Sequence, residues 1–156
     1  MESRELKKIQ SAFAGDYPNG YVLGWDSERF FFDLQKLAKG YELVNDTDFN
    51  YSRCNDFAFC TTDQKEHCSL KISFILDCFW LSFWQVKNRQ GILGHVVERQ
   101  LMNPDLGRLS MRLKLFLESQ SFFEVSKDDL NLVVPGVRLE LAEQATIEKC
   151  LFEDYY

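Results

Sequence analysis

Residues 69–86 read SLKISFILDCFWLSFWQV and contain the two clearest strand patterns in the chain. Apolar residues at every second position of 69–76 predict a strand with one face in the core and one mixed face. The stretch 79–86 is apolar at both sets of alternate positions, which predicts a central strand covered on both faces. We expect the rest of the fold to be built around this pair.

Capping residues and apolar spacing predict helices and strands on either side of the pair. The predicted helices run from Ser3 to Gly15, from Asp26 or Ser27 to Gly40, and from the Asn103 cap and Pro104 to about Ser119. Further strands are predicted at residues 21–25, 41–44, 57–62, 92–97, 122–125, 130–134, 137–141 and 146–152, with turns at 88–91 and 134–137. The expected fold is α+β, a mainly antiparallel sheet with about three helices packed against it.

The composition predicts one globular domain that spans residues 1–156. Aromatic residues make up 15% of the chain, including 14 Phe, which indicates a Phe-rich core. The five cysteines are odd in number and irregularly spaced, so we expect free thiols in a reducing compartment. The charged start and the lack of an apolar run of about 18 residues predict a cytosolic protein without a membrane span.

Charge is spread unevenly along the chain, whose formal net charge is −6. Residues 115–156 hold 9 acidic and 3 basic residues, whereas residues 87–114 hold 6 basic and 2 acidic ones. The basic stretch contains no Phe, Tyr or Trp on which a base could stack, so it is interpreted as solvated surface. The acidic balance argues against nucleic acid or an anionic membrane as partner and favours a basic protein.

Candidate catalytic and metal-binding residues form no diagnostic motif. Cys54, Cys60, His67 and Cys68 lack the close pairing that structural zinc sites use, so they are interpreted as thiols and a surface histidine. No Gly-x-Ser-x-Gly elbow is present, and the paired aspartates at 46/48 and 128/129 are typical of turns. We therefore predict no metal, no cofactor and no enzymatic activity. A catalytic site assembled from residues distant in the chain remains open.

Two groups of residues could bind a partner. Trp80 and Trp84 share one face of the central strand, where they are either covered or available as aromatic anchors. Carboxylates and tyrosines near the C-terminal end could instead pair with Arg and Lys of a basic protein. This second group comprises Asp128, Asp129, Glu148, Glu153, Asp154, Tyr155 and Tyr156.

In general character the chain resembles the immunity proteins that accompany bacterial toxins in contact-dependent inhibition. Like them it is small, acidic and rich in aromatic residues, with no catalytic motif. The resemblance implies a protein that neutralises a cognate toxin domain, commonly by occluding its active site, and it assigns no individual residue. The alternative is a cytosolic domain that binds a small molecule beneath Trp80 and Trp84, or scaffolds an assembly through that face.

Overall fold

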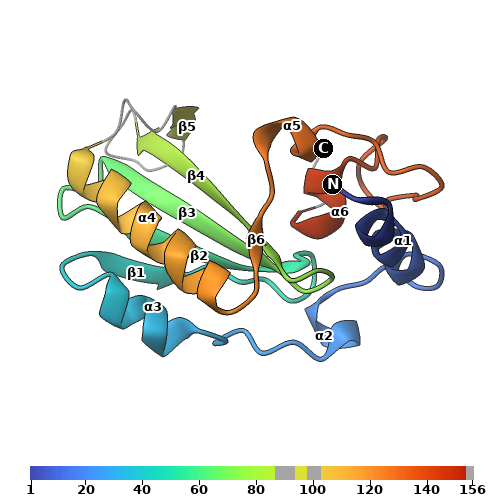
Figure 1. Cartoon of the computed structure of the whole chain (residues 1–156), viewed down its shortest axis with the longest axis horizontal. Helices are drawn as coiled ribbons and strands as arrows, with labels where there is room; N and C mark the ends of the chain where they lie inside the picture. The colour runs from blue at the N-terminus through green and yellow to red at the C-terminus, as the bar shows by residue number, and fades with distance from the viewer. Residues whose placement is uncertain (87–93, 98–102, 154–156) are drawn as a thin grey trace.

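The computed structural model, which describes residues 1–86, 94–97 and 103–153, is built around one twisted sheet (Figure 1). Its strands follow the order β1-β2-β3-β4-β5 with antiparallel neighbours, and the short β6 pairs with β4 in parallel. The strands are β1 (Glu42–Asn45), β2 (Cys54–Cys60), β3 (Glu66–Ser73), β4 (Cys78–Val86), β5 (Gly94–Val97) and β6 (Phe123–Glu124). The predicted α+β class with a mainly antiparallel sheet is confirmed.

Helices are more numerous than predicted in the described residues. They are α1 (Ser3–Ala12), α2 (Gly20–Leu23), α3 (Phe31–Leu37), α4 (Pro104–Ser119), α5 (Lys127–Leu130) and α6 (Ile147–Leu151). None of these described helices has the length and apolarity needed to cross a membrane.

The two strands from which the prediction started form the middle of the sheet. β3 and β4 pair from Glu66 opposite Gln85 to Ile72 opposite Phe79. Across this pair lies α4, whose start was also predicted: the Asn103 side chain accepts a hydrogen bond from the Asp105 amide at 2.9 Å. Long elements with a sustained pattern therefore lie where the sequence places them. The predicted turn at 88–91 lies outside the described residues.

The second predicted helix begins later than expected, at Phe31 rather than just after Asp26 or Ser27. Phe30, which precedes it, has a φ of 65°, a left-handed conformation that is strained for a bulky residue. Packing explains why Phe30 adopts it, because its ring makes edge-on contacts with Phe116 and Phe122. Tertiary contacts thus override the capping signal.

Four predicted strands are wrong, and short capped helices replace two of them. Residues 21–25 lie mainly in α2, where the Asn19 side chain accepts a hydrogen bond from the Val22 amide. Residues 146–152 lie mainly in α6, which is capped by Thr146, and α5, capped by Ser126, ends where the strand at 130–134 was expected to begin. Residues 137–141 form no strand. The turn at 134–137 is present, with Gly136 at a φ of 75°.

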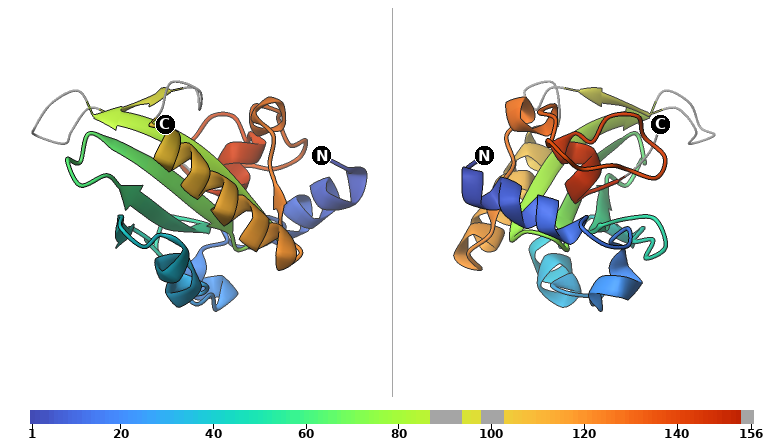
Figure 2. Two further views of the ribbon diagram at one scale, coloured as in Figure 1. Left: turned by 60° about the vertical axis from the view of Figure 1, so that its left-hand side comes forward. Right: turned by 90° about the vertical axis from the view of Figure 1, so that its right-hand side faces the viewer.

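The sheet separates two hydrophobic cores. The first lies between one sheet face and helices α3 and α4, and it includes Phe57, Phe59 and Leu113, all fully buried. The second lies beyond the opposite face, at the end where the chain leaves β3 and enters β4, and packs α1, α5 and α6 together (Figure 2). Its fully buried members include Ile147 and Phe152.

Arg53 joins three distant segments beside the second core. Its side chain is buried, and its guanidinium donates hydrogen bonds to the carbonyls of Pro18 at 3.1 Å and Lys149 at 3.0 Å. The same group lies 5.1 Å from the centre of the Phe13 ring, a cation–π contact. Arg53 therefore holds the turn after α1 against α6.

Gly20 packs closely against the loop before β2, and its amide donates a hydrogen bond to the Phe49 carbonyl at 3.2 Å. A Cβ atom placed on Gly20 would lie 2.5 Å from Phe49 Cδ1, and that ring is held between Tyr21 and Phe74. We expect Gly20→Ala to lower the free energy of unfolding by about 1–3 kcal/mol through overpacking. Urea denaturation measures this change. Gly15→Ala is the control, since nothing lies within 4 Å of its Cβ position, and equal losses for both would contradict the packing argument.

Candidate functional site

The sheet face opposite α4, here called the polar face, carries most of the described polar side chains of β1 to β4. Strand register arranges them in three rows that cross the sheet. The rows are Glu42, Cys60, His67 and Trp84; Val44, Ala58, Ser69 and Ser82; and Asp56, Lys71 and Trp80. Four strands at about 4.8 Å spacing make this face about 14 Å wide. Both candidate tryptophans lie on it, as the alternation in 79–86 predicts.

Trp80 lies where the polar face meets the second core. Its ring centre is 6.0 Å from that of the fully buried Phe152, and the indole is half-buried. The residue after Phe152 is Glu153, whose backbone forms an isolated bridge with Ser52. The chain after α6 therefore brings a carboxylate onto the polar face.

That carboxylate completes an ion-paired cluster. Lys71 Nζ lies 2.6 Å from Asp56 Oδ2 and 2.5 Å from Glu153 Oε1, and the lysine is only 8% exposed. Two carboxylates thus share one ammonium in a largely buried setting, where removal of a single partner is costly. Glu153, predicted to meet a partner, is engaged within the molecule.

The protonation of this cluster follows from burial and from its crowded charges. Burial alone would lower the pKa of Lys71, but the acidic groups around it reverse the direction and raise that pKa. The Asp56 and Glu153 carboxylates supply this effect at neutral pH, because burial raises the pKa of the neighbouring Cys54 thiol and keeps it neutral. Burial also raises the pKa of Glu153, against the effect of Lys71, and the nearby Asp56 adds to the rise.

Trp84 and His67 form the other end of the polar face. Their rings are stacked, with centres 6.0 Å apart and planes within 10° of parallel. The indole Nε1–H donates a hydrogen bond to Ser82 Oγ at 3.0 Å. Burial lowers the pKa of His67, although Asp56 and Asp46 oppose that shift, so the imidazole is neutral at neutral pH. The pair offers flat aromatic surface on which a guanidinium can stack.

The arrangement does not assemble a nucleophile with a base. Ser69 Oγ donates to Asp56, and Ser82 accepts from Trp84, so each hydroxyl is engaged by a group other than His67. Cys60 lies opposite His67 in the register, yet burial, Glu42 and Asp46 raise the pKa of its thiol. A raised thiol pKa is the opposite of what a cysteine nucleophile needs.

The four residues considered for zinc are divided between the two sheet faces. Cys68 belongs to the first core and Cys54 to the second, whereas Cys60 and His67 lie on the polar face. Within residues 1–86, 94–97 and 103–153, no three His, Cys, Asp or Glu side chains are grouped as a metal ion would require.

The remaining candidate residues do not converge with the tryptophans. Asp128 is exposed on α5, and Glu148 is half-buried in the first turn of α6. Asp129 accepts hydrogen bonds from the Met1 ammonium at 3.0 Å and from Ser126, which together lower its pKa. The structure thus brings together Trp80, Trp84 and Glu153 only. Asp154, Tyr155 and Tyr156 lie outside the described residues.

Sequence reasoning placed Lys71 on the mixed side of its strand, next to the tryptophans, but it missed Asp56 and His67 as members of this face. A usable signal was present, because polar residues occupy every second position from His67 to Lys71 opposite the buried series. The ion-pair partners of Lys71, Asp56 and Glu153, are 15 and 82 residues away in the sequence. A local sequence pattern cannot predict contacts over such separations.

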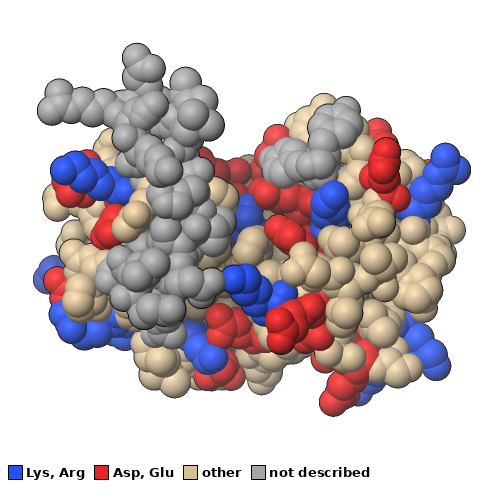
Figure 3. Space-filling view, turned by 90° about the horizontal axis from the view of Figure 1, so that it is seen from above, with Lys and Arg blue, Asp and Glu red and all other residues tan. Residues whose placement is uncertain are grey.

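The predicted solvated basic stretch is described only in part. Arg108 forms an ion pair with Asp105, and Lys114 Nζ lies 2.7 Å from Glu124 Oε2. From above, the described Asp and Glu side chains lie beside Lys and Arg rather than in separate patches (Figure 3). In the described part of the basic stretch, Arg108 and Arg112 are exposed. Comparison of the chain with protein-family models, curated proteins and solved structures finds no match.

Proposed function

We propose that the protein is a non-enzymatic inhibitor of the immunity type, which binds a basic toxin domain in the cytoplasm and occludes its active site. The observation that supports this is the charge of the polar face. Glu42, Asp46, Asp56 and Glu153 surround or border it, whereas Lys71 is the one ammonium within the three described rows. A cationic surface is the complementary partner.

Recognition on this face would combine charge with aromatic contact. Carboxylates at the β1 side, Glu42 and Asp46, are exposed and can attract Arg and Lys over several ångströms. The Trp84–His67 stack supplies a planar surface for a guanidinium. The middle row has smaller side chains than the rows on either side, so a cationic side chain of the partner would meet the larger side chains of the two outer rows.

The proposed contact with the partner lies on the polar face and not at the C-terminal carboxylates. Glu153 is already paired with Lys71, so its reversal would disturb folding as well as binding. The small-molecule alternative has less support, because Trp80 packs on Phe152 and Trp84 on His67, which fills the space beside each indole.

The proposal predicts that Glu42→Lys/Asp46→Lys abolishes capture of a basic partner. Tagged wild-type protein, this variant and the matched control Asp16→Lys/Asp77→Lys, whose carboxylates are also exposed, serve as baits in lysate of the source cells at low salt. We expect one basic protein to be retained by wild type and control and lost from Glu42→Lys/Asp46→Lys. Its association with that variant should be about tenfold slower at low salt.

Activity decides whether the captured protein is a toxin. Purified partner should damage a cellular target, and one equivalent of wild-type protein should abolish that activity. Equal retention by all three baits, an acidic partner, or a partner that stays active in the complex would contradict the proposal.

A further inference from the structure

A second surface, separate from the polar face, lies between α1 and the turn that joins β3 to β4. It is an open groove of about 870 Å³. One wall is α1, and the other is formed by the end of α2 and the turn. The lining residues are Ser3, Arg4, Lys7, Lys8, Ser11 and Ala12 on the first wall and Leu23, Phe74 and Ile75 on the second.

The α1 wall is cationic. Arg4, Lys7 and Lys8 are all exposed, and none of them forms an ion pair with another described residue. Lys71 and Lys114, in contrast, each meet two carboxylates. These three cations share one helix face in a chain whose net charge is −6, and they would attract an anionic ligand.

The opposite wall is apolar and held in place. Phe74 packs against Trp25, with ring centres 4.9 Å apart, and against Phe49 at 5.9 Å. Leu23 is 39% exposed at the end of α2, and Ile75 is half-buried beside Phe74. Because these side chains present apolar surface already supported from behind, the wall can bury apolar side chains without rearranging.

From these two walls we infer that the groove binds an extended segment of a partner protein in which acidic and apolar residues alternate. In an extended chain, successive side chains point to opposite sides, so carboxylates would face α1 while apolar residues face Leu23 and Phe74. The spacing also agrees. Arg4 and Lys8 are four residues apart, about 6 Å along the helix, and every second residue of an extended chain repeats about every 6.6 Å.

A protein segment fits this groove better than a nucleic acid does. Base stacking needs an open aromatic face, but the Phe74 ring is already packed against Trp25 and Phe49. The apolar wall would also remain unused by a phosphate backbone. The inference does not depend on the proposed function, since it concerns another surface and a ligand of opposite charge.

A pair of isomeric peptides tests the inference. The probe is a fluorescently labelled octapeptide of alternating Glu and Leu, and its isomer carries four Glu followed by four Leu. Anisotropy titration of the whole protein should show the alternating peptide binding at least about tenfold tighter than the isomer. Equal affinity of the two peptides, or no binding of the alternating one, would overturn the inference.

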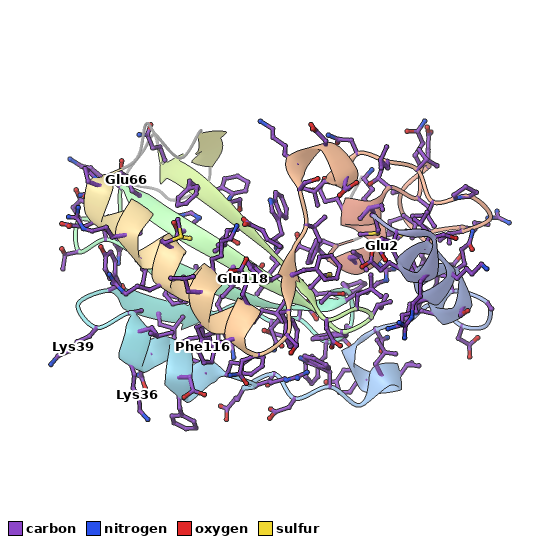
Figure 4. All side chains as sticks on the ribbon, viewed as in Figure 1. Glu2, Lys36, Lys39, Glu66, Phe116 and Glu118 are labelled. Atoms are coloured by element: carbon purple, nitrogen blue, oxygen red, sulfur yellow. The ribbon has the colours of Figure 1, made fainter. Side chains whose placement is uncertain are left out.

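Two matched variants assign the binding to the groove. Lys7→Glu/Lys8→Glu should weaken the alternating peptide by about tenfold or more, whereas Lys36→Glu/Lys39→Glu, at the other end of the molecule (Figure 4), should change it by less than about twofold. Leu23→Glu should also weaken binding, with Leu115→Glu, exposed on α4, as its control. Equal effects within either pair would refute the assignment, as would displacement of the peptide by oligouridine but not by unlabelled peptide.

Discussion

Replacing Lys71 with methionine should lower the free energy of unfolding by about 3–5 kcal/mol at neutral pH. The substitution leaves Asp56 and Glu153 facing each other beside the second core, with no cation between them. Methionine retains most of the apolar stem, so the loss reports on charge rather than packing. Urea denaturation at pH 7 measures it. Lys65→Met, at an exposed position in the turn before β3, is the control and should cost less than about 0.5 kcal/mol.

The same variant should regain stability in acid. Burial already raises the pKa of Glu153 from its ordinary value of 4.5, and loss of Lys71 removes the group that opposes this rise. An acid whose pKa is higher in the folded than in the unfolded protein binds more protons when folded, so stability increases as pH falls. The deficit of Lys71→Met relative to wild type should therefore narrow as pH falls from 7 toward 4.5. A deficit independent of pH would show that the ion pairs are not its source.

Phe152→Ala should lower the free energy of unfolding by about 3–5 kcal/mol, because it empties a fully buried position in the second core. The Trp80 ring loses its aromatic neighbour as well, so its emission should shift to longer wavelength before global unfolding. Phe32→Ala, at a 67% exposed position on α3, is the matched control and should cost less than about 1 kcal/mol. Similar losses for the two variants would mean that the second core adds little to stability.

The success of sequence reasoning depends on the length of each element. β3, β4 and α4 have 8, 9 and 16 residues, long enough for a period of two or 3.6 to be recognised. By contrast, α2 and α6 have 4 and 5 residues, too few to show a helical period. Their caps, Asn19 and Thr146, are the sequence signal they leave, and a capping residue followed by apolar residues is equally compatible with a strand, which is what was predicted.

The same distinction between local pattern and tertiary packing applies to the residues of the candidate site. Alternation within 79–86 correctly placed Trp80 and Trp84 on one face, because strand geometry alone decides that. The pairing of Glu153 with Lys71 depends on how α6 packs against the sheet, and no local pattern encodes it. Charge by itself therefore suggested an available carboxylate where the fold uses one internally.

The contacts of Arg53 also constrain the order in which the chain can fold during synthesis. The two carbonyls that its guanidinium binds are 35 residues earlier and 96 residues later in the chain. The β2–β3–β4 meander is complete once Val86 has been made, and it can form early because its contacts are local. The hydrogen bond from Arg53 to the Lys149 carbonyl cannot form until Lys149 has left the ribosome. The second core is therefore completed only after nearly all of the described chain has been translated.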